Sequence, residues 1–506
     1  MKRSIKLKSI ALLLLLSLLI LPLVSCKGNG DSDDTRDTTI STNDTKVDNY
    51  TCELPSDLNY DGEEITMISR DHIGTSDEFF VESTDTAVGS AVFRRNTAVE
   101  DMLGVKLKIT PLADNATDTH YTIVRQIENE VLAGGSDTYD IVTAPHYTMT
   151  GGQQKGIFAD LTDIEYLNLS KYYWTQGYNE YISVGSSQYL ATGAATLTIY
   201  RYMYVTVINT EMFENNKLPS VHEAVKNNEW TMEYQIDIAK NLYSDVNGDD
   251  KRDLGDQYGF AAGARTSVDA YWVTTNNIAV KKNADNFYTY NGSVERVSNM
   301  VDKMLELFYD CGGSYIVASS KDGTDQSEII EVFTNGKTAM ANVMINSIES
   351  GFVGKEISFE IAPYPKYDKN QAEYYSHIQD QVTVLAIPIS KSAERCQMIG
   401  AVMEALAAEG YKEMYKSYFE NILPYRYLQT PESGEMLTLI YESSNFGYLG
   451  MAISNTFQWA QVLRGIMASE VNMVSSKMAT AATDVPKQLE ETNNFYIELN
   501  QQTQKQ

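Results

Sequence analysis

Strand-like and helix-like stretches alternate along the first part of the chain. Residues 65–69 form a β-prone apolar segment that ends at Arg70 and Asp71, and residues 105–109 alternate between apolar and polar side chains. Between these two strands, residues 91–103 place Val92, Val99 and Leu103 on one side of a helix. The same patterns then recur as a helix over 121–133, closed by two glycines, and a strand over 139–143.

Strands that alternate with helices are typical of a largely parallel sheet with right-handed crossovers. In such sheets, ligands bind beyond the carboxyl ends of the strands. The pattern therefore favours Arg70 and Asp71, after the first strand, and His146, after the third, as polar groups of a binding site.

The rest of the chain continues as a mixture of strands and helices. Residues 188–209 are rich in Tyr and β-branched residues, which predicts a connecting strand pair. Further elements are expected as helices over 232–242 and 294–309, a helix, turn and strand over 331–344, a strand over 382–387, and helices from 393 almost to the end. The sequence thus predicts an α/β fold without internal repeats.

The N-terminus is typical of an export signal. Four cations between Lys2 and Lys8 precede an apolar run over 10–24, which is too short for a membrane span. The run ends in Leu-Val-Ser-Cys, which resembles a bacterial lipoprotein signal over residues 1–25, with Cys26 as the lipidated residue. An ordinary signal peptide with an incidental cysteine is the alternative.

Residues 26–54 are expected to be a disordered tether between the lipid and the folded body. From 27 to 49 the segment is polar, without aromatic residues, and cannot bury enough apolar surface to offset the entropy of ordering. A loop packed into the fold is the alternative. The chain after the tether is long enough for two domains.

Charge and cysteine content exclude several classes of function. A formal net charge of −28 disfavours nucleic acid and other polyanions as partners. Beyond Cys26, only Cys52, Cys311 and Cys396 remain, which is neither a disulfide framework nor a zinc cluster. A Cys311–Cys396 bridge and buried free thiols both stay open.

Several short motifs, in order along the chain, resemble one family. They are Val-Leu-Ala-Gly-Gly-Ser-Asp-Thr-Tyr-Asp-Ile-Val at 131–142, Gly-Ile-Phe-Ala-Asp-Leu at 156–161, Glu-Val-Phe-Thr-Asn-Gly-Lys-Thr-Ala-Met at 331–340 and Ile-Ala-Pro-Tyr-Pro-Lys at 361–366. The chain is similar here to the extracellular solute-binding proteins of family 1, the sugar-binding subunits of ABC importers. The similarity extends over nearly all of the chain after the tether.

This resemblance implies a two-lobed periplasmic-binding-protein-like fold of type II with hinge strands between the lobes. Lobe 1 is expected over 55–190 and 345–392, and lobe 2 over 193–340 and 393–506. The crossings are expected near 191–193 and near 341–345, and Gly193 suits a hinge because glycine accommodates changes in φ and ψ.

Sugar sites combine aromatic faces with planar polar side chains in a mostly preformed cleft. Trp459 is similar in position to a stacking Trp of maltose-type members, and Trp272 is a second candidate platform, whereas Trp230 and Trp174 are expected to pack in the core. Together with polar residues at strand ends and near the hinge, the predicted ligand-binding residues are Arg70, Asp71, His146, Tyr200, Arg201, Trp272, Asn346, Gln379, Asp380 and Trp459.

Residues 245–256 have the spacing of an EF-hand calcium loop and resemble the dockerin variant, with Asp at the last position. Oxygen ligands fall at positions one, three, five, seven, nine and twelve, the seventh as a backbone carbonyl: Asp245, Asn247, Asp249, Lys251, Asp253 and Asp256. Position six is Asp250, where glycine is usual. A structural calcium ion and a solvated acidic turn are the two interpretations.

The resemblance implies a lipid-anchored protein on the outer face of the cell membrane that captures a carbohydrate and delivers it to ABC permease subunits. It is expected to act as a monomer and without enzymatic activity. Motifs of serine, zinc or cysteine hydrolases are absent from the sequence. A peptide- or polyamine-binding relative on the same fold and a surface-anchored glycan hydrolase are the alternatives.

Overall fold

A computed structural model describes residues 52–71, 77–81, 84–113, 121–134, 138–318, 326–428, 430–451 and 457–503. These residues belong to one compact unit, Tyr50–Gln506. The export signal, Cys26 and the tether up to residue 51 lie outside the described residues. No described helix is both long enough and apolar enough to cross a bilayer.

The end of the predicted tether packs onto the fold. Cys52 and Leu54 contact the apolar core beside the first sheet, and the Glu53 carboxylate pairs with the Lys171 ammonium group. Residues 52–54 therefore belong to the folded unit, which corrects the expected boundary at 54.

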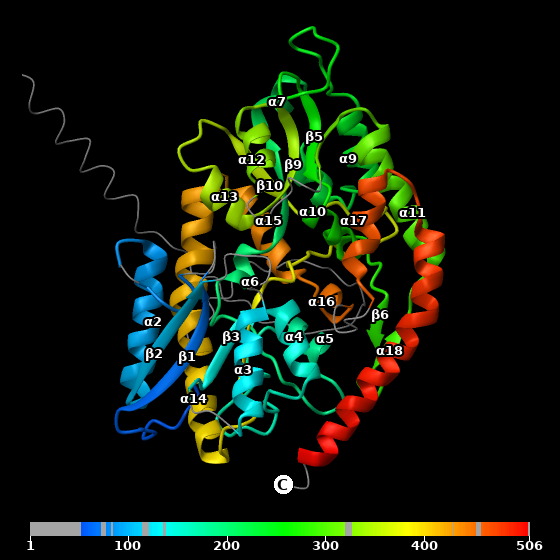
Figure 1. Cartoon of the computed structure of the whole chain (residues 1–506). Coiled ribbons are helices and arrows are strands. Elements are labelled where there is room, and N and C mark those ends of the chain that lie inside the picture. The colour runs from blue at the N-terminus through cyan, green and yellow to red at the C-terminus, as the bar shows by residue number, and fades with distance from the viewer. Residues whose placement is uncertain are drawn as a thin grey trace, which may run out of the picture. The chain divides into compact units, whose positions relative to one another are not determined.

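The first sheet has four strands in the order β11-β3-β1-β2 (Figure 1). The strands are β1 (Glu63–Asp71), β2 (Val105–Ala113), β3 (Ile141–Pro145) and β11 (Thr383–Ala386). β1 runs parallel to β2 and β3, as the alternating pattern predicted, whereas β11 pairs antiparallel with β3. The two helices predicted from the same pattern are α2 (Ala87–Leu103) and α3 (Thr122–Leu132), and the structure adds α4 (His146–Gln154) and α5 (Gln176–Ile182).

Helix α14 (Ala393–Gly410) packs on this first sheet. Its buried Ile399 and Val402 share one apolar cluster with Ile65 of β1 and Val99 of α2. The assignment of everything from residue 393 onward to lobe 2 is therefore wrong for α14. Helix α14 is apolar because most of its surface is buried. An apolar composition does not reveal which of the two sheets the helix packs on.

The second sheet has five strands in the order β10-β4-β9-β5-β8. They are β4 (Tyr204–Asn209), β5 (Tyr258–Gly263), β8 (Ser314–Val317), β9 (Thr338–Met344) and β10 (Phe359–Ala362). Helices around it are α7 (Thr210–Asn215), α8 (Val221–Lys226), α9 (Met232–Lys240), α10 (Thr266–Thr274), α11 (Val294–Leu305), η2 (Glu306–Asp310), α12 (Ser327–Thr334), α13 (Ile345–Gly351), α15 (Pro431–Glu442), α16 (Gly447–Met451) and α17 (Trp459–Ser469).

Strand β10 corrects the predicted lobe boundary. It pairs antiparallel with β4, so the chain stays with the second sheet after β9 and crosses to the first only between residues 362 and 383. The crossing expected near 341–345 is instead the end of β9 and the start of α13. The position of the crossing depends on the pairing of strands that are far apart in sequence. The local pattern of apolar residues does not indicate which strands pair.

The crossing near Gly193 lies where it was expected, but glycine is needed there for a different reason. A Cβ at Gly193 would lie 2.3 Å from the Tyr173 carbonyl oxygen, so close backbone approach excludes any side chain. The predicted strand pair over 188–209 is only partly correct, because the short helix α6 (Thr198–Arg201) precedes the single strand β4.

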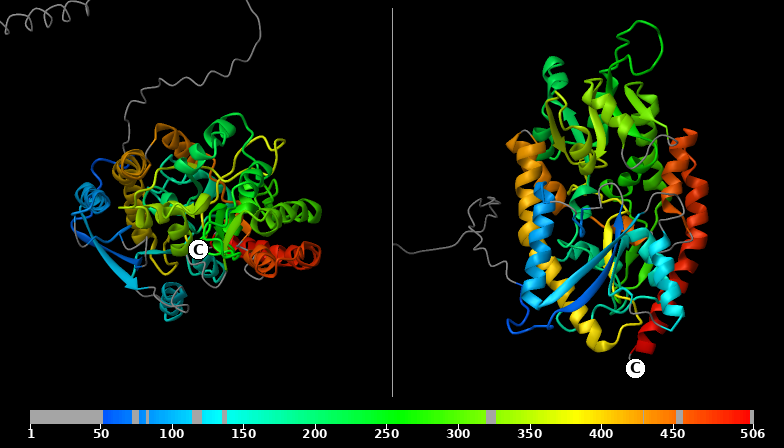
Figure 2. Two further views of the ribbon diagram at one scale, coloured as in Figure 1. Left: turned by 90° about the horizontal axis from the view of Figure 1, so that it is seen from above. Right: turned by 60° about the vertical axis from the view of Figure 1, so that its left-hand side comes forward.

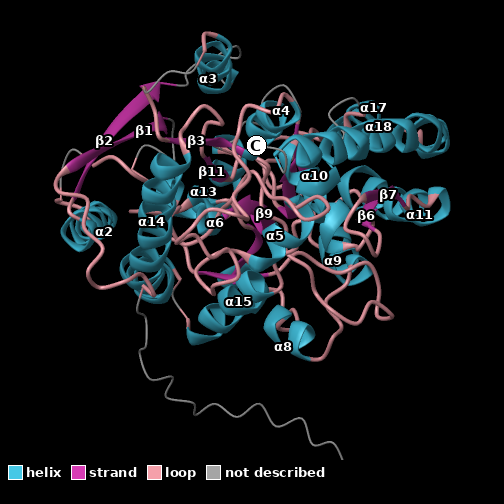
Figure 3. Cartoon of the chain, turned by 90° about the horizontal axis from the view of Figure 1, so that it is seen from below, coloured by secondary structure: helices cyan, strands magenta, loops and turns pink. Residues whose placement is uncertain are grey.

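Two long helical stretches run along the flanks of the folded unit. α14 continues into the π-helix η3 (Tyr411–Tyr427), and α18 (Val474–Thr503) runs along the opposite side (Figure 1; Figure 2). The small hairpin of β6 (Val280–Lys282) and β7 (Tyr288–Tyr290) packs against α18 (Figure 3). In this region Asn500 accepts hydrogen bonds from Ser187 and Tyr189.

Predicted packing roles of two tryptophans are confirmed. Trp230 is fully buried, and its indole N–H donates to the Pro363 carbonyl, while Thr231 caps α9. Trp174 donates to the buried Glu404 carboxylate at 2.9 Å. Among the described cysteines, Cys52, Cys311 and Cys396 are free thiols.

Candidate ligand-binding site

A cavity of about 440 Å³ lies between elements of the two sheets. Its described lining residues are Tyr121, Tyr147, Asp380, Tyr448, Phe457, Gln458, Trp459, Ala460 and Gln461. Tyr121 and Tyr147 come from α3 and α4, beside the first sheet, whereas α16 and the start of α17 supply the opposite wall. Asp380 lies on the crossing segment just before β11. We call this the aromatic cavity.

The aromatic walls are fixed by ring contacts. Tyr121 and Tyr147 meet edge to face with centroids 6.3 Å apart, and Phe457 meets Trp459 at 4.6 Å. Behind Trp459, the ring of Trp272 packs edge-on at 5.6 Å and that of Tyr290 stacks at 6.4 Å. The rings therefore form a preformed surface that presents apolar faces with little freedom to move.

Asp380 supplies the charge of the cavity. Its backbone carbonyl accepts from the Tyr147 N–H at 3.2 Å, which fixes the segment against α4. Apart from its own backbone N–H, its carboxylate has no donor and no ion-pair partner among the described residues. Burial raises the pKa of Asp380, and Arg464 and Arg70 act in the opposite direction.

A buried ion pair supports the cavity from behind. The Arg464 Nε lies 3.2 and 3.0 Å from the two carboxylate oxygens of Asp269, and its Nη2 donates to Oδ2, so two guanidinium nitrogens bind one carboxylate. Burial opposes the charge of Arg464, but Asp269 raises the pKa of that guanidinium above its ordinary value. Tyr448, which lines the cavity, also hydrogen-bonds to Asp269.

Two of the predicted ligand residues, Asp380 and Trp459, line this cavity, and the others lie elsewhere. Trp272 is fully buried behind Trp459 rather than facing the cavity. His146 bonds through its ring nitrogens to Tyr178 and to the Leu449 carbonyl, at 3.0 and 3.2 Å. Its neighbour Tyr147, at the same strand end, lines the cavity.

Arg201 and Tyr200 have structural roles in the crossing region. The Arg201 guanidinium is buried and pairs with Asp77, at 2.5 Å, and with Glu349, at 3.3 Å. The Tyr200 ring is buried among the rings of Tyr415, Tyr418, Phe419 and Tyr441. Both side chains are thus engaged by partners within the protein and lie outside the described lining of the aromatic cavity.

The remaining predicted residues also lie outside the described lining of the cavity. Arg70 is buried and donates to the Gln381 amide oxygen at 3.0 Å. Gln379 is buried, with its backbone N–H on the Tyr202 carbonyl. Asp71 and Asn346 are half-buried, at the end of β1 and on α13.

Most of the lining was missed by the sequence analysis. Tyr121, Tyr448, Phe457, Gln458 and Gln461 follow no strand end and form no motif. Only the closeness of Phe457 and Gln458 to Trp459 in sequence offered a signal for them.

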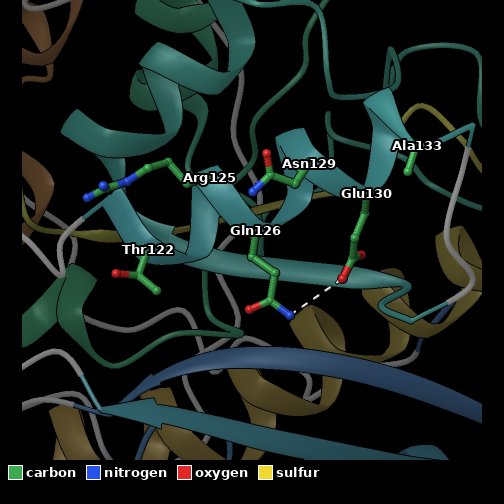
Figure 4. A pocket seen from close by; sticks show the side chains of 6 residues that line it. All are labelled: Thr122, Arg125, Gln126, Asn129, Glu130 and Ala133. Atoms are coloured by element: carbon green, nitrogen blue, oxygen red, sulfur yellow. Dashed lines mark hydrogen bonds between the residues drawn. The ribbon is translucent and has the colours of Figure 1, made fainter.

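A second hollow of about 480 Å³ runs along one face of α3 (Figure 4). Its lining comes from that helix alone: Thr122, Arg125, Gln126, Asn129, Glu130 and Ala133. The Gln126 amide donates to the Glu130 carboxylate at 3.4 Å, and none of the described residues that line the hollow is aromatic. A one-sided polar surface of this kind resembles an ordinary helix face, and we do not assign the site to it.

The predicted calcium loop folds as a series of tight turns. The Asp245 carboxylate accepts from the N–H groups of Gly248 and Asp250 at 2.7 and 3.0 Å, and Asp250 itself has a φ of 57°. Asp256 is fully buried and accepts from the Tyr243 hydroxyl at 3.1 Å. Among the described residues, no three His, Cys, Asp or Glu side chains form a group that could hold a metal ion. Calcium binding stays a prediction.

Comparison with known proteins identifies the fold through similarity to solved structures. No protein-family model and no curated protein matches the chain. It is similar to the cyclic α-maltosyl-1,6-maltose-binding protein of Arthrobacter globiformis (TM-score 0.55, 11% identity, covering 85% of this chain and 99% of that one). It is also similar to a cyclo/maltodextrin-binding protein complexed with maltotetraose (0.51, 13%, 84% and 98%).

A third similar structure is an ABC substrate-binding protein of Listeria monocytogenes in complex with cycloalternan (TM-score 0.50, 14% identity, covering 88% of this chain and 99% of that one). All three likenesses span nearly the whole length of the compared proteins. At these identities they establish the architecture and nothing finer. The chain has the two-lobed α/β fold of periplasmic-type solute-binding proteins.

Proposed function

We propose that this protein is the substrate-binding subunit of an ABC importer and that it captures a carbohydrate in the aromatic cavity. The observation that carries the proposal is the cavity itself, which lies between elements of the two sheets and combines five aromatic rings with a carboxylate and two glutamines. The fold, shared with several oligosaccharide-binding proteins, supports the same conclusion.

Each part of the lining has a role in this proposal. The aromatic faces stack on the apolar C–H surfaces of sugar rings. Asp380, Gln458 and Gln461 exchange hydrogen bonds with hydroxyl groups, which fix orientation and specificity. Because the lining comes from both sides of the crossing segments, a bound ligand stabilises the closed arrangement, and a permease distinguishes closed from open.

The lipid anchor belongs to the same proposal. Lipidation of Cys26 would hold the protein at the outer face of the cell membrane, and the polar segment over 27–49 would let it reach a permease. Tethering raises the effective concentration of the protein near that partner. Mass spectrometry of the membrane-extracted protein tests this part, since an unmodified Cys26 in the mature chain contradicts it.

Binding without turnover is favoured over glycoside hydrolysis. A glycosidase needs two carboxyl groups on either side of the scissile bond, about 5 to 9.5 Å apart. Asp380 is the single carboxylate among the described residues that line the cavity. Incubation of the purified protein with oligosaccharides should give no cleavage products, and turnover that is lost in D380N would favour the hydrolase.

The experiment that tests the proposal is a thermal-shift screen of the purified protein over glycans, peptides and polyamines. A bound carbohydrate should raise the melting temperature, because ligands that bind only the native state stabilise it by mass action. Trp459→Ala should abolish the shift, whereas Phe93→Ala, an exposed ring on α2, should retain it. Stabilisation by peptides or polyamines and by no glycan would overturn the carbohydrate assignment.

We further propose that residues 245–256 bind a structural calcium ion. The support is the spacing of oxygen side chains and the positive φ of Asp250 at position six, where EF-hand loops need a glycine-like turn. The ion would brace a loop beside β5 and take no part in ligand binding.

A further inference from the structure

We propose that the aromatic cavity selects a glycan that carries a protonated amine over its neutral counterpart. This inference rests on the proposed carbohydrate-binding function and adds the chemical class of the ligand. Its basis is the combination, in one cavity, of several aromatic faces, one carboxylate and no lysine, arginine or histidine among the described lining residues.

Two nearby guanidinium groups hydrogen-bond to other side chains, and their positive charges also act on Asp380. Arg464 points its Nε at both oxygens of Asp269, at 3.2 and 3.0 Å, and Arg70 donates to the Gln381 side chain at 3.0 Å. No ion pair within 4 Å joins either guanidinium to Asp380 among the described residues. The Asp380 carboxylate is therefore available to a cation that enters the cavity.

A half-buried carboxylate of this kind favours a charged partner. Removing a carboxylate from water is costly unless a donor or a cation replaces the water. An ammonium group would add the attraction between two opposite full charges to its hydrogen bond with Asp380, and this attraction is stronger in a site shielded from water. A neutral sugar would offer only hydroxyl donors.

The rings contribute in the same direction. The faces of Tyr and Trp carry partial negative charge and attract a cation. Tyr121, Tyr147, Tyr448 and Trp459 all line the cavity, and Tyr121 is 45% exposed. The net charge of −28 also concentrates cations near the protein surface. A sugar ring that carries an amine would contact both the aromatic side chains and the carboxylate of this lining.

Isothermal titration with a matched pair of ligands tests the inference on the unmodified protein. The pair is a β-1,4 glucosamine tetrasaccharide and its fully N-acetylated form, which have the same length and linkage and differ in charge. A maltotetraose arm and a spermidine arm complete the set. We expect the amine form to bind at least about tenfold more tightly than either neutral glycan, with a preference that weakens as salt rises.

Asp380→Asn should remove that preference, so that the variant binds the amine form no more tightly than it binds the N-acetylated form. The matched control is Asp237→Asn, an exposed residue of α9 with the same change in net charge. Equal affinity for charged and neutral glycans in the wild type overturns the inference and leaves the proposed function standing. Binding of spermidine and of no glycan overturns the proposed function itself.

Discussion

Two acidic residues near the crossing segments differ in what surrounds them. Glu78 is buried, and its carboxylate accepts from the N–H groups of Leu197 and Thr198 and from the Thr198 hydroxyl, each at 2.8 Å, and from the Thr383 hydroxyl at 2.5 Å. Among the described residues, the Asp380 carboxylate accepts a hydrogen bond only from its own backbone N–H, and Asp380 lines the cavity. Burial raises the pKa of both.

The difference separates a structural carboxylate from a binding one. Both carboxylate oxygens of Glu78 accept hydrogen bonds, one from residues 197–198 and the other from Thr383 of β11, so Glu78 holds these segments together. Asp380 has been positioned by backbone contacts while its oxygens remain available. The completeness of the hydrogen bonding, rather than burial or location near the hinge, distinguishes the two roles.

The largest effect should come from Glu78→Ala. Four donors lose their acceptor, and unsatisfied buried donors cost about 1 to 3 kcal/mol each before relaxation. We expect the melting temperature to fall by more than about 5 °C, with Glu78→Gln intermediate. Asp380→Asn should change it by less than about 2 °C. Similar losses in both, measured by differential scanning calorimetry, would remove the distinction.

The second largest effect should come from Trp459→Ala, which should weaken glycan binding. Loss of a stacking ring costs about 2 kcal/mol, which lowers glycan affinity roughly thirtyfold. Trp459→Phe should retain part of the affinity because it keeps an apolar face. Titration calorimetry measures both variants, and circular dichroism checks folding, since Trp459 is only 3% exposed. Unchanged affinity in Trp459→Ala would place the ligand elsewhere.

Acid should destabilise the cavity side through its buried histidines. Burial lowers the pKa of His377 to about 3 and that of His146 to about 4, from an ordinary 6.5. Between pH 6.5 and those values the unfolded chain binds protons that the folded chain does not, so stability falls as pH falls. The loss is about 1.4 kcal/mol per pH unit for each histidine.

His377→Phe provides the control for that slope. Its ring stacks on Tyr204 with an interplanar angle of 14°, which a phenyl ring can reproduce. The variant should lose about half of the decrease in melting temperature between pH 6.5 and 5. A slope identical to that of the wild type would show that His377 ionises as freely in the folded state as in the unfolded state.

Calcium should have the smallest effect. If residues 245–256 bind the ion, EGTA should lower the melting temperature by about 2 to 4 °C, equivalent to about 1 kcal/mol, and leave glycan affinity unchanged. Asp245→Asn with Asp249→Asn should remove the response to EGTA. An EGTA response that persists in this double variant would exclude the loop as the calcium site.

The sequence predicted the helices and strands well and the residues of the candidate binding site less well. Strands β1 to β3 and helices α2 and α3 follow from apolar periodicity, because each buries one face locally. The positions of β10 and α14 depend on partners far away in the chain, and periodicity does not specify them. The lobe boundaries were therefore less accurate than the elements.

Arg201 illustrates why the site was harder to predict. A polar residue beside a crossing has the same local pattern whether it faces a ligand or an ion pair. Its partners Asp77 and Glu349 lie 124 and 148 residues away in sequence. Trp459 was selected by its similarity in position to a stacking Trp of the resembled family and Asp380 by its place before the strand over 382–387, and both line the cavity. Their neighbours in the lining carried no comparable signal.

Tryptophan fluorescence gives the most direct test of the claim that the aromatic cavity binds the ligand. The chain has four tryptophans, and Trp459 is the one that lines the cavity. Titration with malto- and glucosamine oligosaccharides should change the emission in a saturable manner, and Trp459→Phe should abolish most of that change while binding remains detectable by calorimetry. A saturable change that persists undiminished in Trp459→Phe, or calorimetric binding without any change in emission, would contradict the account.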